Sequence, residues 1–238
     1  MGLEADFTNY IQNRLAAVEI FSETQSTSNI ELDGALKTAS KNQTGKIGYP
    51  DHIALVEDFV LVMEDKSDRL KLILRDDGEI SQSVDATTHY AINGALFYAH
   101  KILDATHYDK IFAFGNVGDR KHHIIKPVFI DGDKNIKELP EVDTFKNFTA
   151  ENIEAYYRRM VLGEESAEEI ELKKILAAQK HCMNTCATTD NLARTKSHLS
   201  SRRFCLHWRR KKISTLRNLP AIRLTPTAKK FSTTLKII

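Results

Sequence analysis

The sequence predicts an α/β fold in which helices flank both faces of a central mixed β-sheet. Two apolar segments, residues 51–56 and 59–64, are separated by only two acidic residues, as in a β-hairpin. Two further apolar segments of strand length, residues 111–115 and 124–130, follow along the chain. Segments with helical periodicity lie before, between and after these strands. Such a mixture is typical of a sheet covered by helices.

Two helices are predicted before the hairpin. Residues 3–21 carry an apolar stripe at about helical spacing, and residues 31–41 show a second stripe after a polar break. Ser28 or Asn29 is placed to cap the second helix, because short polar side chains accept hydrogen bonds from the first free amides of a helix.

Further elements are predicted after the hairpin. Residues 70–74 should form a short strand or extended arm, and a long helix should run from residue 85 or 87 to about 103. A helix over residues 148–162 should end at Gly163. A last helix, acidic at its start, should cover residues 166–179.

The hairpin is expected to bring charged residues together at its open end. If the turn centres between Glu57 and Asp58, Asp51 lies directly opposite Glu64. Opposed side chains in an antiparallel pair have Cβ atoms roughly 4.5–5.5 Å apart. Two carboxylates at that spacing repel each other unless a cation lies between them. Lys66, two residues after Glu64, points to the same face of the strand.

These residues match the pattern of a known nuclease signature. Pro50-Asp51, then twelve residues, then Glu64-Asp65-Lys66 resembles the P-D, spacer, D/E-x-K signature of metal-dependent nucleases. More widely, residues 1–180 resemble the N-terminal region of bacterial restriction–modification polypeptides that carry an N-6 adenine DNA methylase further on. The segments that carry this resemblance are Ala91–Ala99, Lys110–Gly115, Lys121–Val128 and Glu138–Val142.

The resemblance implies a restriction-endonuclease-like sheet and a Mg²⁺ site. Asp51 and Glu64 would hold one or two Mg²⁺ ions, since hard cations prefer carboxylate oxygens. Lys66 would orient or deprotonate a water, or stabilise the charge of the pentacovalent phosphorus. A helix before the strands often supplies a further metal ligand in this fold, and Glu31 is the candidate. The competing interpretations are a solvated first-turn glutamate at residue 31 and a solvated hairpin end.

The function expected from this resemblance is that of a Mg²⁺-dependent DNA endonuclease domain in a restriction–modification protein. The expected partners are DNA and a specificity (target-recognition) subunit, and no membrane. The chain contains no Asn-Pro-Pro-Tyr or Asp-Pro-Pro-Tyr motif and no glycine-rich cofactor loop after a strand, so methyl transfer is not expected. The alternative is an inactive or non-enzymatic fragment that folds, or binds DNA, for a larger methylase.

Composition and charge add two expectations. No window approaches the ~20 apolar residues of a membrane helix, and the start of the chain lacks the features of a secretory signal, so a cytoplasmic location is expected. Residues 1–180 hold 21 basic and 31 acidic residues, a net charge of −10. DNA affinity depends on neutralising phosphates. We therefore expect weak, salt-sensitive binding of DNA by this region alone.

Residues 181–238 differ from the rest of the chain. They carry 13 Lys and Arg, one acid and no steady apolar period. Cys182, Cys186 and Cys205 do not have the paired spacing of a zinc site, and no disulfide is expected. A basic nucleic-acid arm is one interpretation. Another is a frameshift, because codons for residues 181–210 can be chosen that yield an acidic, amphipathic peptide when read one nucleotide out of phase.

The predicted organisation therefore has three parts. Residues 1–165 form the nuclease-like α/β domain, and residues 166–180 begin a connecting helix. Residues 181–238 form a poorly structured, out-of-frame basic tail with no ordered metal at its cysteines.

Overall fold

The computed structural model describes residues 3–42, 44–165 and 169–180 of the chain. The chain divides into two units near residue 166. In the second unit, residues 169–180 are helical, where the sequence predicts a helix. The predictions for residues 181–238, including the frameshift, the basic arm and the cysteines, lie outside the described residues.

The first unit is built on a five-stranded mixed sheet, which confirms the predicted α/β architecture. The strand order is β1-β2-β5-β6-β7. Strands β2 and β5 are parallel, and the other neighbouring pairs are antiparallel. The strands are β1 (His52–Val56), β2 (Phe59–Lys66), β5 (Lys110–Gly118), β6 (His123–Asp131) and β7 (Ile136–Glu138).

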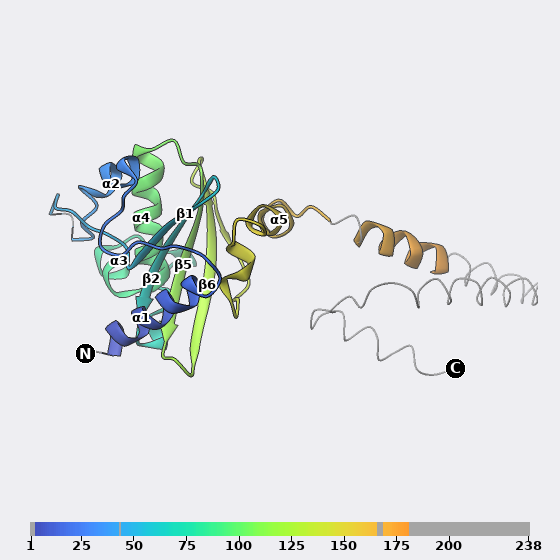
Figure 1. Ribbon diagram of the computed structural model, residues 1–238, viewed down its shortest axis with the longest axis horizontal. Helices are drawn as coiled ribbons and strands as arrows, with labels where there is room; N and C mark the ends of the chain where they lie inside the picture. The colour runs from blue at the N-terminus through green and yellow to red at the C-terminus, as the bar shows by residue number, and fades with distance from the viewer. Residues whose placement is uncertain (1–2, 43, 166–168, 181–238) are drawn as a thin grey trace, which may run out of the picture. The chain divides into compact units, whose positions relative to one another are not determined.

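Helical segments cover both faces of this sheet (Figure 1). One face packs against α1 (Leu3–Ala16) and against the segment that contains α5 (Ile153–Tyr157). The other face packs against α2 (Ile30–Leu36) and α4 (Ala91–Ala105). Strand β2 lies between these two apolar layers, and its residues from 59 to 65 are all buried. A near-continuous apolar strand is what a position covered on both faces requires.

The hairpin has the predicted register. His52 pairs with Met63 and Val56 pairs with Phe59, so the turn lies at residues 57 and 58. Glu57 adopts a left-handed backbone with φ of 53°. The same register, continued by one residue beyond β1, places Asp51 opposite Glu64.

Several predicted helices are shorter than expected. Helix α1 ends at Ala16 and α2 at Leu36, several residues before the ends that periodicity indicates. The N-cap of α2 is Asn29, whose side chain accepts hydrogen bonds from the amides of Glu31 and Leu32. The expected helix over residues 148–162 is a sequence of short turns. It comprises a 3₁₀ helix (Phe145–Phe148), α5 and a π-helix (Arg158–Leu162), and it ends as predicted at Gly163, which has φ of 72°.

Over residues 70–74, where the sequence predicts a short strand or extended arm, the strand does not form. A 3₁₀ helix, η1 (Arg69–Lys71), begins there, because the Asp68 side chain caps the amide of Leu70. A small separate hairpin of β3 (Arg75–Asp76) and β4 (Glu79–Ile80) follows.

The predicted long helix from residue 85 or 87 is divided in two. Helix α3 (Val84–His89) and α4 are separated by Tyr90, which has an extended backbone with φ of −115° and ψ of 136°. The break lets the amide of Ile92 donate to the carbonyl of Leu72. The apolar pattern runs through the break, so periodicity alone does not reveal it.

A buried polar network joins the two strands of the hairpin to their neighbours. His52 and Asp65 are both fully buried, and His52 Nε2 lies 2.8 Å from Asp65 Oδ2. His52 Nδ1 lies 2.8 Å from Gln12 Oε1 on α1, and Asn116 on β5 donates to Asp65 Oδ1 at 2.8 Å. The His52 ring therefore bridges Gln12 on α1 and Asp65 on β2 through its two nitrogens.

We predict that His52→Ala destabilises the protein by about 3–5 kcal/mol, because it leaves the Asp65 carboxylate buried without its partner. His89→Ala is the matched control, since His89 pairs with Asp85 at 2.9 Å on an exposed helix surface. The control should change the free energy of unfolding by less than about 0.5 kcal/mol. Urea unfolding of the two variants measures both values. Equal, small effects would contradict this role of the network.

Candidate active site

Asp51, Glu64 and Lys66 come together at the open end of the hairpin. Glu64 is 2% exposed, and its Oε2 lies 3.6 Å from Lys66 Nζ. The carboxylate of Asp51 accepts a hydrogen bond of 2.8 Å from the backbone amide of Asp65. This bond ties the residue before β1 to the strand that carries the other two side chains.

The two acids interact electrostatically. Burial raises the pKa of Asp51 from its ordinary value of 3.8 to about 7, and the charges of Glu64 and Asp65 add to this rise. The Asp65 amide and the Lys66 ammonium oppose the rise, but they do not cancel it. At Asp51, burial and the neighbouring carboxylates therefore outweigh the groups that favour the charged form.

The same charges act on Lys66. Burial would lower the pKa of this ammonium, but the carboxylates of Glu64, Asp51 and Glu4 together raise it above its ordinary value. Lys66 is therefore protonated near neutral pH. Burial, followed by the charges of Glu64 and Asp51, also raises the pKa of Tyr98, whose ring lies on α4 beside the cluster.

Two residues of this cluster were not predicted from the sequence. Glu4 on α1 lies 3.1 Å from Lys66 Nζ through its Oε1. The helical spacing of the sequence indicates which face of α1 Glu4 lies on, because Glu4 precedes the buried Phe7 and Ile11 by three and seven residues. It does not indicate the contact with Lys66. Lys41, in the turn after α2, lies 2.5 Å from Glu64 Oε2. No local signal distinguishes this lysine from other turn lysines.

Glu31, the expected further metal ligand, lies elsewhere. Its carboxylate is exposed and accepts hydrogen bonds from the backbone amide of His107 at 3.1 Å and from the His107 ring at 2.9 Å. The hydrogen bond from the His107 ring, followed by that from the amide, lowers the pKa of Glu31. The structure thus joins Asp51, Glu64 and Lys66 and gives Glu31 a different partner.

The donor set fits a hard divalent cation that shares its coordination with a substrate. Among residues 3–42, 44–165 and 169–180, no group of three or more His, Cys, Asp and Glu side chains is arranged to hold a metal ion. Mg²⁺ in proteins is commonly held by one or two carboxylates, with water and substrate phosphates completing its octahedron. Asp51 and Glu64 provide two such carboxylates.

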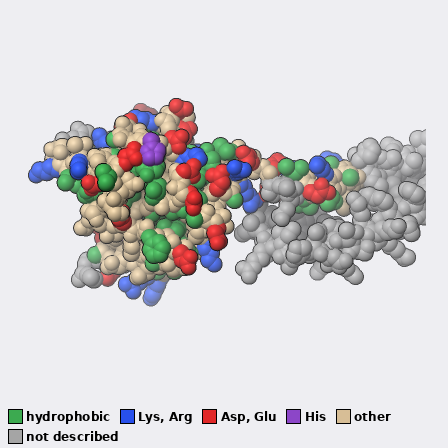
Figure 2. Space-filling model, turned by 45° about the horizontal axis from the view of Figure 1, so that its top comes forward, with side chains coloured by type: hydrophobic (Ala, Val, Ile, Leu, Met, Phe, Trp, Pro, Cys, Tyr) green, Lys and Arg blue, Asp and Glu red, His purple; other side chains and the backbone are tan. Residues whose placement is uncertain are grey.

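The surface of the first unit carries mixed charge. On the face shown in Figure 2, Lys and Arg side chains are scattered among Asp and Glu rather than gathered into one patch. Within the described parts of the chain, no helix is both long enough and apolar enough to cross a membrane.

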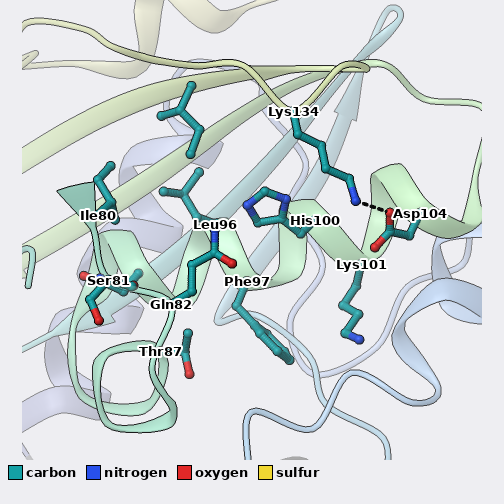
Figure 3. Close-up of a pocket in the computed structure, with 12 residues that line it drawn as sticks. Ile80, Ser81, Gln82, Thr87, Leu96, Phe97, His100, Lys101, Asp104 and Lys134 are labelled. Atoms are coloured by element: carbon teal, nitrogen blue, oxygen red, sulfur yellow. Dashed lines mark hydrogen bonds and ion pairs between the residues drawn. The ribbon is translucent and has the colours of Figure 1, made fainter. Parts of the chain in front are cut away.

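A separate pocket of about 480 Å³ lies beside α4, between β4 and the connection from β6 to β7 (Figure 3). Lys134 and Asp104 form an ion pair of 2.5 Å at this pocket. The Nε2 atom of His100 is buried there without a hydrogen-bond partner, and burial, followed by the charge of Lys134, lowers the pKa of His100. The pocket is not lined by Asp51, Glu64 or Lys66, so it is distinct from the acidic cluster.

Comparison with known proteins gives one informative similarity. Over 164 residues, the chain is 36% identical to the protein named Type II restriction enzyme and methyltransferase RM.BcgI, from Heyndrickxia coagulans. The match covers 67% of this chain and 26% of that protein, so the chain spans about a quarter of the length of this relative. No family model matches the chain, and no solved structure matches it.

Proposed function

We propose that residues 1–165 form the Mg²⁺-dependent DNA endonuclease domain of a restriction–modification protein, with the PD-(D/E)xK type of site. The observation that carries this proposal is the meeting of Asp51, Glu64 and Lys66 at the end of one hairpin, where burial, followed by the charges of Glu64 and Asp65, raises the pKa of Asp51. The similarity to a restriction enzyme and methyltransferase supports the same assignment.

In this proposal Asp51 and Glu64 hold the Mg²⁺ ion. When bound, Mg²⁺ supplies charge neutralisation of the scissile phosphate and lowers the pKa of a water that attacks it. Lys66 remains protonated, because the neighbouring carboxylates raise its pKa. A protonated lysine cannot deprotonate a water. Lys66 therefore donates hydrogen bonds to the phosphoryl oxygens as their negative charge develops.

Glu4, rather than Glu31, is the acid from a preceding helix that joins the cluster. A helix before the strands does supply an acid to the cluster, but that helix is α1 and the acid lies 3.1 Å from Lys66 Nζ. In the proposal Glu4 and Glu64 together orient the Lys66 ammonium. Glu31 is left with its surface contact to His107.

DNA is the proposed substrate, and the affinity for it is expected to come largely from other parts of the assembly. Residues 1–180 carry a net charge of −10, and nonspecific DNA affinity depends on neutralised phosphates. A target-recognition subunit or domain would supply the missing contacts. The N-6 adenine methyltransferase activity of a complete protein would lie beyond this domain.

The alternative is a non-enzymatic fragment that binds DNA or stabilises a larger methylase. The acidic net charge favours its second form, because a domain that only stabilises a larger protein needs no affinity for phosphates of its own. The alternative predicts no Mg²⁺-dependent cleavage under any condition, which the following experiment distinguishes.

We predict that the chain nicks supercoiled DNA with Mg²⁺ and that EDTA abolishes the activity. Glu64→Gln and Lys66→Met should each lower the nicking rate by about 100-fold or more, because each removes a charge that acts on the reacting phosphate. Glu57→Gln and Lys37→Met are matched controls, since both residues lie on the surface, and they should retain the wild-type rate. Cleavage that survives in both site variants, with folding checked by thermal melting, would contradict the assignment.

Protonation of Asp51 leads to a pH-dependent prediction for stability without metal. The folded protein keeps a proton on Asp51 up to a pH of about 7, whereas an ordinary aspartate loses it near 3.8. The folded state therefore binds more protons than the unfolded state in this interval, so stability falls as pH rises from about 4 to 7.

Asp51→Asn removes this loss while its Oδ1 can still accept the Asp65 amide. The variant should be more stable than the wild type at pH 8 by at most about 4 kcal/mol, with a much smaller difference near pH 4. Urea unfolding in EDTA at both pH values measures the difference. A stability difference that does not change with pH would contradict the raised pKa of Asp51. Mg²⁺ should reduce the difference at pH 8.

A further inference from the structure

The ammonium of Lys41 lies in a recess beside the candidate metal ligand Glu64. The distance from Lys41 Nζ to Glu64 Oε2 is 2.5 Å, and the two side chains are 14% and 3% exposed. The ammonium also lies 5.0 Å from the centre of the Tyr98 ring, a distance at which a cation is attracted to an aromatic face. Lys41 is thus held by a carboxylate and a ring, and it is largely shielded from solvent.

Helix α4 leaves the space that this ammonium fills. A Cβ atom on Gly94 would lie 3.0 Å from Lys41 Nζ and 3.2 Å from Glu64 Cγ. It would also lie 2.9 Å from the carbonyl oxygen of Thr87, so α4 could not keep its position. A glycine inside a helix costs about 1 kcal/mol relative to alanine. The recess for the ion pair is therefore a specific feature of this packing.

The two lysines of the site are not equivalent. Both form ion pairs with the same oxygen of Glu64, Lys41 at 2.5 Å and Lys66 at 3.6 Å. Lys66 is shared with Glu4 and belongs to the nuclease signature, whereas Lys41 belongs to a turn outside that signature. The closer contact to Glu64 is therefore made by the lysine to which the proposed chemistry gives no role.

We propose that Lys41 is the resident counter-cation of the metal site, which neutralises Glu64 in the metal-free protein and competes with a divalent ion for it. This inference rests on the proposed function, because it takes Glu64 to be a metal ligand. An ammonium beside a carboxylate occupies lone pairs that a metal would use, and its positive charge repels the incoming ion. Lys41 thereby sets the affinity of the site for the metal, independently of the chemistry of cleavage.

The test measures Mn²⁺ binding to the full chain by electron paramagnetic resonance, without DNA. Lys41→Met should lower the dissociation constant for Mn²⁺ about tenfold, and Lys41→Arg, which keeps the charge, should not lower it. Lys41→Gln removes the charge but keeps a donor for Glu64, so it gives a second neutral variant if methionine prevents folding. Lys37→Met is the matched control, since Lys37 is 63% exposed and pairs with Asp33, and it should bind Mn²⁺ as the wild type does.

A thermal readout complements the binding measurement. Without metal, Lys41→Met and Lys41→Gln should melt at a lower temperature than the wild type, because Glu64 is left buried beside Asp51 with less neutralising charge. Saturating Mn²⁺ should raise their melting temperatures more than it raises that of the wild type.

The outcomes separate this inference from the proposed function. Loss of Mn²⁺ binding in Glu64→Gln would show that the wild type binds the ion through Glu64. If the neutral Lys41 variants then bind Mn²⁺ with equal or lower affinity than the wild type, the counter-cation role is overturned and the metal site stands. If neither the wild type nor the neutral Lys41 variants bind Mn²⁺, both proposals are overturned.

Discussion

The hydrogen bond between His52 and Asp65 is the interaction on which the candidate site depends most. It joins the two strands of the hairpin from the face opposite Glu64, in a fully buried position where no water can replace a lost partner. His52 follows Asp51 directly, and Asp65 lies between Glu64 and Lys66. A shift of either strand would therefore break this bond and separate the charged side chains on the other face. Gln12 and Asn116 extend the restraint to α1 and β5.

Successive side chains of a strand point to opposite faces of the sheet, so the polar residues of the hairpin form two separate groups, one on each face. On the face towards α1, His52 and Asp65 satisfy each other with neutral amides as neighbours. On the face towards α4, Glu64 is paired with two lysines, and Asp51 accepts a hydrogen bond from the amide of Asp65. The first arrangement pairs both ring nitrogens of His52 and both carboxylate oxygens of Asp65 within the protein, and it stabilises the fold. In the second, burial and neighbouring charges raise the pKa of Asp51, and strongly perturbed groups of this kind are common at functional sites.

The hairpin and its register could be predicted because they depend on local signals. Two apolar strands and a two-residue turn determine which residues oppose each other, and the pairing of His52 with Met63 agrees with that prediction. Glu4 and Lys41 could not be found in this way, since their contacts join residues 62 and 23 positions apart. Glu31 lies in a helix before the hairpin, as the resemblance requires, but its carboxylate contacts His107. The break at Tyr90 could not be predicted, because the apolar spacing continues through it. It is accompanied by a hydrogen bond from the amide of Ile92 to the carbonyl of Leu72, which is distant in the sequence.

The proposed site must bind a divalent cation at the hairpin end, and a crystal of the chain soaked in Mn²⁺ would reveal where such an ion binds. The anomalous scattering of manganese locates the ion without reference to any activity. If Asp51 and Glu64 hold the ion, the manganese peak lies about 2.0–2.3 Å from carboxylate oxygens of both residues. Lys41 is then displaced from its contact of 2.5 Å with Glu64. Manganese bound instead at Glu31 and His107, or anywhere away from Asp51 and Glu64, would contradict the proposed site.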